Sequence, residues 1–172
     1  MLSDQLIRLI ERQADRLEKQ WEGMIRSHPA TPSYQHLNDK ALAGRIHEVY
    51  QHLGDCLEDS QNAENLAHLF MEIGARRKHQ NIPLHEIIFT IVLARRNIWN
   101  FIMEEGPFTS TLQWHQVNEC WDRIMKFFDK NMYFVVLGYD QGLGDKRKGK
   151  DVVSSLLHSF SMGVLPEVEK RS

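Results

Sequence analysis

Apolar residues recur along most of this chain at intervals of three and four positions, the spacing that places them on one face of an α-helix. This spacing predicts helices over residues 4–27, 39–59, 63–78, 84–105 and 111–139. A further helical segment is predicted near residues 152–160. No stretch alternates apolar and polar residues as a half-buried strand does. The pattern therefore predicts an all-α fold, a helical bundle of five to six helices.

The predicted helix over residues 84–105 is the one around which the bundle is organised. Most of its apolar residues lie on one broad arc, but Phe89 and Leu93 fall on the opposite side. A helix that is apolar on two sides is usually central in a bundle or lies at a subunit interface. Gly106, followed by a proline, ends the helix.

Three polar residues interrupt the apolar faces of the third, fourth and fifth predicted helices: Arg77, Arg95 and Asn131. An unpaired charge inside a protein is very costly, so each arginine needs an acid, a carbonyl or an anion as its partner. Pairing with an internal acid such as Glu72 or Glu48 explains the arginines structurally, as does reaching the surface along the alkyl stem. An anionic ligand between the helices is the functional explanation. Asn131 is either a helix-register device or a polar group of a pocket. These three residues are the candidate ligand-binding residues.

The predicted helix over residues 111–139 would be ~45 Å long, longer than a compact domain of this size needs. Phe127, Phe134 and Leu137 give it apolar surface beyond its main stripe. Such surface is seldom left exposed to water. The three residues are therefore predicted to form the interface of a homodimer. The alternative is that residues 152–160 fold back over the same patch within one chain.

Composition divides the chain into three parts. Residues 1–141 form the predicted helical domain, and residues 142–150 form a glycine-rich, basic segment with the composition of a flexible linker. Residues 151–172 form a predicted C-terminal helical tail. The net charge of −2 argues against general attraction to nucleic acid. The longest apolar run is far shorter than the ~20 residues of a membrane span, so a cytoplasmic protein is expected.

The sequence holds no glycine-rich phosphate loop, no His-Glu-x-x-His and no Cys-x-x-Cys. No catalytic residue, no cofactor and no metal site are predicted. His52 and Cys56 lie one turn apart, but a metal site needs two more ligands at matching spacing. Cys56 and Cys120 each lie on an apolar stripe, which indicates buried thiols in a reducing compartment rather than a disulfide.

Three groups of residues, taken together, point to one family. The first is Trp21 followed by Ser27-His28-Pro29 and a loop with a tyrosine. The second is Gly74-x-x-Arg77 followed by Ile82-Pro83-Leu84-His85-Glu86-Ile87, and the third runs from Phe127 to Tyr133. Over roughly residues 5–140 the chain resembles the RsbRD-type N-terminal domain of RsbT co-antagonist proteins in the bacterial stressosome. That domain is also found at the front of sensor histidine kinases.

The resemblance implies a bundle related to globin-like domains that lack haem, and a bacterial sensory or regulatory module that is not itself catalytic. Such domains dimerise and pass a signal through their last helix to an output domain or protein partner. The rival interpretation is a haem- or small-anion-binding globin-like sensor. His79 and His85 are the histidines nearest to the central helix, and one axial histidine suffices to hold haem in a globin.

Overall fold

The computed structural model describes residues 2–43, 46–58, 63–106, 108–142 and 153–158. Every regular element in these ranges is helical, which confirms the predicted all-α class. The elements are α1 (Leu2–Arg12), α2 (Ala14–Ser27), the 3₁₀-helix η1 (Pro32–His36), α3 (Asp39–Ala43), α4 (Ile46–Gln51), α5 (Leu53–Leu57), α6 (Ala63–His79), α7 (Leu84–Glu105) and α8 (Thr111–Gln141). No described helix is both long enough and apolar enough to span a lipid bilayer.

Two of the predicted helices are divided in the structure. The helix predicted over residues 4–27 breaks at Gln13, whose φ of −103° and ψ of 17° depart from helical values. The segment predicted as one helix over residues 39–59 forms α3, α4 and α5. Within α5, the backbone N–H of Gly54 donates to the Glu11 carboxylate of α1 at 2.8 Å. This bond ties α5 to α1, a constraint that helical spacing in the sequence does not reveal.

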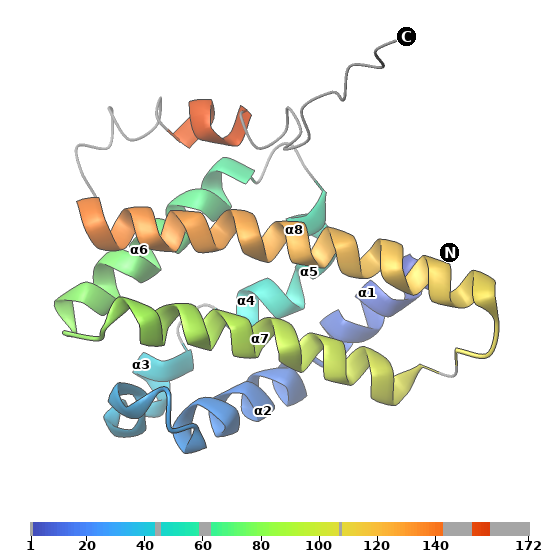
Figure 1. Ribbon diagram of the computed structural model, residues 1–172, viewed down its shortest axis with the longest axis horizontal. Helices are drawn as coiled ribbons and strands as arrows, with labels where there is room; N and C mark the ends of the chain where they lie inside the picture. The colour runs from blue at the N-terminus through green and yellow to red at the C-terminus, as the bar shows by residue number, and fades with distance from the viewer. Residues whose placement is uncertain (1, 44–45, 59–62, 107, 143–152, 159–172) are drawn as a thin grey trace, which may run out of the picture.

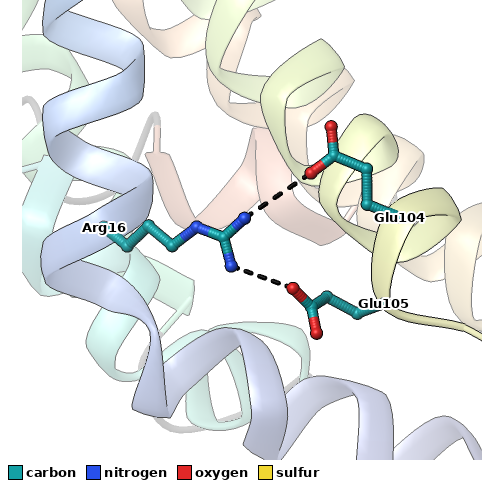
Figure 2. A network of polar contacts seen from close by, with 3 residues as sticks. All are labelled: Arg16, Glu104 and Glu105. Atoms are coloured by element: carbon teal, nitrogen blue, oxygen red, sulfur yellow. Dashed lines mark hydrogen bonds and ion pairs between the residues drawn. The ribbon is translucent and has the colours of Figure 1, made fainter.

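Helix α7 is central, as its two apolar sides predicted. It runs side by side with α8 along the long axis of the molecule, while α2 packs along another side of it (Figure 1). Leu93 and Ile98 are both buried. At the C-terminal end of α7, Arg16 of α2 reaches Glu105 at 2.9 Å and Glu104 at 3.6 Å (Figure 2). This arginine offsets two carboxylates at a helix C-terminus, where negative charge is unfavourable.

Helices α6 and α8 cross with their backbones in direct contact, an arrangement visible in Figure 1. A methyl group at Gly74 would overlap the carbonyl oxygen of Val135, and one at Gly138 would overlap the carbonyl oxygen of Met71. Each glycine thus accommodates the main chain of the other helix. Because protein interiors are close-packed, no side chain separates the two helices at this point.

The turn from α6 to α7 is fixed by hydrogen bonds to the last carbonyls of α6. The N–H of Ile82 donates to the carbonyl of Arg77 at 3.0 Å, and that of Asn81 donates to Lys78 at 2.9 Å. This pair of bonds is the Schellman motif, which places the residue after the helix cap in the left-handed region. Asn81 occupies that position with φ 57°, and asparagine tolerates this conformation better than most residues.

The residues predicted to form a dimer interface lie mostly inside the core of their own chain. Phe127 and Phe134 are buried, and the Phe127 ring packs edge-on against Phe70 with 6.0 Å between centroids. Leu137 is only partly covered. Residues 153–158 are helical, and Val153 is fully buried in the same core. The exposed apolar surface that motivated the interface is therefore absent at both phenylalanines, and the homodimer stays a prediction. Residues 143–152 and 159–172, which hold nearly all of the predicted linker and most of the predicted tail, lie outside the described residues.

Replacing either crossing glycine should destabilise the fold. We expect Gly74→Ala and Gly138→Ala each to lower the free energy of unfolding by about 2–3 kcal/mol, because the added methyl forces two backbones apart. Gly23→Ala is the matched control, since a methyl group there meets no atom within 4 Å. That variant should gain about 0.5–1 kcal/mol from improved helix propensity. Urea unfolding followed by circular dichroism measures all three, and equal midpoints for Gly74→Ala and Gly23→Ala would contradict the close crossing.

Candidate functional site

The three groups of residues singled out in the sequence meet at one place in the fold. Trp21 of α2, Tyr34 of η1, Arg77 of α6, Ile87 of α7 and Phe128 of α8 all line the same cavity. The side chains come from five elements, which belong to three separate stretches of the sequence. Residues that matched one family pattern in separate stretches thus share one location in space.

The cavity is small and mostly apolar, with a volume of about 50 Å³. A cavity needs ~10–15 Å³ measured in this way to hold one water molecule, so this one is larger than a packing defect. Among its described lining residues there is no carboxylate, cysteine or histidine. The lining residues are Trp21, Tyr34, Leu42, Ile46, Val49, Phe70, Ile73, Arg76, Arg77, Ile87, Thr90, Ile91, Ala94 and Phe128.

Arg77 supplies the positive charge of the cavity wall. Its side chain is buried, donates to the Gln80 side-chain oxygen at 2.9 Å and donates to the Leu42 carbonyl at 3.3 Å. The guanidinium carbon lies 5.3 Å from the centre of the Tyr34 ring, within the range of a cation–π contact. Burial lowers the pKa of Arg77, and the nearby Tyr34 opposes this shift. Arg77 remains charged in this environment, because guanidinium does not lose its proton in proteins.

Tyr34 and Glu86 hold the loop between α2 and α3 against the start of α7. Burial raises the pKa of Tyr34, and the neighbouring Arg77 lowers it in part. The buried carboxylate of Glu86 accepts hydrogen bonds from the N–H of Ser33 at 2.9 Å and from its hydroxyl at 2.8 Å. Glu86 lies in the first turn of α7, where the helix dipole favours negative charge. The buried Glu86 carboxylate, with its two hydrogen bonds from Ser33, therefore positions the part of the cavity wall that contains Tyr34.

Buried hydrogen bonds join α2 and α4 to the face of α7 that lines the cavity. The indole N–H of Trp21 donates to the carbonyl of Thr90 at 2.8 Å. The side-chain amide of Asn97 donates to the carbonyl of Leu17 at 2.8 Å. The Tyr50 hydroxyl donates to the carbonyl of Ala94 at 3.3 Å. Polar side chains on these faces thus bind main chain across the interface, which fixes the register of the helices.

Of the three predicted ligand-binding residues, the structure places only Arg77 in the cavity wall. Arg95 instead forms an ion pair with Asp129 of α8 at 2.8 Å, with 62% of the Asp129 side chain exposed. Asn131 is buried and donates to the carbonyl of Phe127, one turn earlier in the same helix, at 2.8 Å. Its side-chain oxygen has no hydrogen-bond partner among the described residues. Tyr34 was noted in the sequence only as part of a motif, and Thr90 was not singled out, yet both line the cavity.

The described residues bring together one group that has the donor types for a metal: Asp15, Glu18 and His47, with ligand atoms within 4.8 Å of one another. His47 Nδ1 lies 2.7 Å from a Glu18 oxygen and 3.6 Å from an Asp15 oxygen. Partly exposed acids beside a histidine account for this group as an ion pair between α2 and α4. His79 and His85, the haem candidates, are exposed and do not line the cavity.

Comparison with known proteins gives one match. A family model described as "Histidine kinase N terminal" matches residues 3–141, which include all helices from α1 to α8. Neither a curated protein nor a solved structure matches the chain significantly.

Removing Arg77 should cost more stability than removing Arg95. We expect Arg77→Met to lower the free energy of unfolding by about 2 kcal/mol, because the buried carbonyl of Leu42 loses a charged donor. Arg95→Met should lower it by less than about 1 kcal/mol, since its partner is exposed. Urea titrations of both variants measure the difference, and equal losses would show that Arg77 is solvated.

The buried tyrosines should make the fold sensitive to alkali. Burial raises the pKa of both Tyr34 and Tyr50 in the folded chain. The unfolded chain then releases these protons first, so stability is complete below about pH 10 and falls as the pH rises beyond it. The urea midpoint of Tyr34→Phe should fall less than that of the wild type between about pH 9 and about pH 11. Tyr133→Phe, at an exposed position, is the control. Parallel pH profiles for wild type and Tyr34→Phe would contradict the prediction.

Proposed function

The chain belongs to the family of histidine kinase N-terminal domains, and we propose that it is a non-catalytic sensory module whose input is occupancy of the cavity at Arg77. The observation that supports this most directly is the convergence of side chains from five elements on one mostly apolar cavity with a buried guanidinium in its wall. Ligand sites in proteins have this character, with apolar linings and a few placed polar groups.

The chemistry of the lining indicates the class of ligand. Apolar side chains supply most of the wall, and Arg77 and Arg76 supply positive charge on one side of it. Tyr34 adds a buried phenol beside Arg77. A molecule with an apolar body and one anionic group matches both features, because a carboxylate pairs with guanidinium and an aliphatic body is removed from water.

The size of the cavity implies that binding is coupled to movement. A volume of about 50 Å³ is well below that of an engineered cavity of ~150 Å³ that accepts benzene. A ligand of several carbon atoms therefore requires the walls to separate. Such a change of shape is what a sensory module needs in order to report occupancy.

The output half of the proposal is dimerisation and relay through α8. The resemblance to RsbRD-type domains supports this, since those domains act as pairs and signal through their last helix. With Phe127 and Phe134 buried, the partly exposed Tyr133 and Leu137 offer the apolar surface on the C-terminal half of α8. The same resemblance extends the proposal to bacterial stress signalling and to a globin-like arrangement of the helices.

Ligand binding is tested by thermal unfolding of the full chain with straight-chain carboxylates of about three to eight carbons. A saturable rise in melting temperature is expected, because binding to the folded state alone stabilises it. The alcohols of the same length should give a smaller rise. Arg77→Met should abolish the preference for the acid, and Arg95→Met should keep it. No change in melting temperature with any acid would remove the support for this ligand class.

Dimerisation is tested by light scattering on the full chain. The mass of two chains is expected for the wild type, and Leu137→Glu should shift it toward one chain. Leu112→Glu is the control, because Leu112 is 67% exposed at the opposite end of α8. A wild-type mass of one chain, measured at concentrations in the micromolar to millimolar range, would reject this part of the proposal.

A further inference from the structure

We infer that the cavity lies at the seam between two rigid groups of helices, and that a change in its occupancy moves one group relative to the other as a lever. The frame consists of α2, η1 and α7. The lever consists of α6 and residues 127–141 of α8. The inference rests on the proposed function only for the cavity as the input site.

The lever is interlocked at the level of its backbones. Gly74 and Gly138 each accommodate the main chain of the opposite helix, with no side chain between them. Sliding or rotation of α6 on α8 would drive carbonyl oxygens into main-chain atoms. Further along the same contact, the ammonium of Lys78 lies 5.4 Å from the centre of the Tyr139 ring. The two helices therefore move together, as rigid pieces that repack at their boundaries rather than deform.

The frame is joined by buried hydrogen bonds and by charge. Side chains of α2 and α7 bind each other's main chain through Trp21 to Thr90 and Asn97 to Leu17. At the far end of α7, Arg16 holds the two terminal glutamates, as Figure 2 shows. Breaking any buried pair would leave an unsatisfied polar group, which resists separation of α2 from α7.

The seam between frame and lever is held more weakly. Arg77 crosses it with its cation–π contact to Tyr34 of η1, at 5.3 Å from the ring centre. Arg95 of α7 crosses it to Asp129 of α8 in a pair that is largely exposed, and such pairs add little stability. The cavity itself lies beside the Arg77 contact, where wall atoms lack close neighbours. Movement therefore costs least along this seam.

A short joint connects the two groups. Residues 80–83 link α6 to α7, and the Schellman bonds attach Asn81 and Ile82 to the lever side. Pro83 follows in an extended conformation, with φ −61° and ψ 141°, and begins the frame side. Hinges are commonly a few residues of this kind at the ends of helices. The C-terminal end of α8 lies beside this joint, where the ammonium of Lys78 is 5.4 Å from the Tyr139 ring. The far end of the lever is therefore the N-terminal end of α6 at Ala63, which movement about the joint displaces most (Figure 1).

The experiment fills the cavity with a larger side chain, called the wedge below, so that no ligand is needed. Ala94 is buried and lines the cavity from the frame side. Ala94→Leu adds three carbon atoms to a cavity of about 50 Å³ and should push the lever away. Spin labels are placed in pairs of exposed residues, in a full chain whose Cys56 and Cys120 are replaced by alanine. The lever pair is Asn65 and Asp140, the frame pair is Lys19 and Arg96, and the seam pair is Lys19 and Asn65.

The distance between the two spin labels should change in the seam pair alone. We expect the seam distance to shift by about 2 Å or more with the wedge, the scale of helix movements in switching proteins. The lever and frame distances should each change by less than about 1 Å. An equal change in the lever pair overturns the inference, and so does an unchanged seam pair in a wedge variant that keeps its helical content. Leu93→Phe is the control, because Leu93 is buried on α7 but does not line the cavity.

Two further measurements keep the test decisive if Ala94→Leu does not fold. Ile91→Phe places a second wedge in the same wall and should give the same pattern. In the unmodified chain, hydrogen exchange of amides near Gly74 and Gly138 should report a single opening free energy. Exchange of the C-terminal half of α8 at a rate independent of α6 overturns the lever. None of these measurements requires a ligand. A failed carboxylate titration would therefore reject the proposed ligand class, while the distance and exchange measurements would still test the lever.

Discussion

The buried guanidinium of Arg77 is the constraint around which the rest of the structure is arranged. A guanidinium held inside a protein needs hydrogen-bond acceptors for its N–H groups, because an uncompensated buried charge is strongly destabilising. Gln80, Leu42 and Tyr34 meet this need from three elements. Those contacts draw the α2–α3 loop onto the end of α6, and the space left between loop, α6 and α7 is the cavity. The same charge that the fold must satisfy is then the one an anionic ligand can use.

Periodicity predicted the long helices well, because each carries a continuous apolar face and clear ends. Helices α6, α7 and α8 begin and end close to the predicted positions, and a capping box of Ser110 and Gln113 marks the start of α8. The breaks at Gln13 and within residues 39–59 were not predictable in this way. Gln13 is neither proline nor glycine, so only the packing of α1 and α2 on different neighbours explains the change of direction.

The site was predicted in part, and the misses share a cause. A helical wheel assigns residues to faces without knowing how many neighbours a helix has. Helix α8 is contacted by α1, α5, α6 and α7, so Phe127 and Phe134 are buried on sides that seemed free. Arg95 lies on an apolar arc, yet its long side chain reaches the groove beside α8 and pairs with Asp129. Arg77 was identified correctly as a charge on an apolar face, but its partners, a carbonyl and an amide, carry no sequence signal.

The free energy needed to shift a two-state equilibrium sets a lower limit on the length of a ligand that can open such a seam. Moving a two-state protein from 1:99 to 99:1 requires a difference in binding free energy of about 5.5 kcal/mol between the states. Burial of apolar surface supplies about 0.8 kcal/mol for each methylene group, so some seven methylene groups account for that difference. A chain of that length exceeds the cavity of about 50 Å³ several-fold. If the cavity is the input site, a ligand that fits it without movement binds but does not switch the protein, whereas one that is too long gains its full burial only when the seam opens.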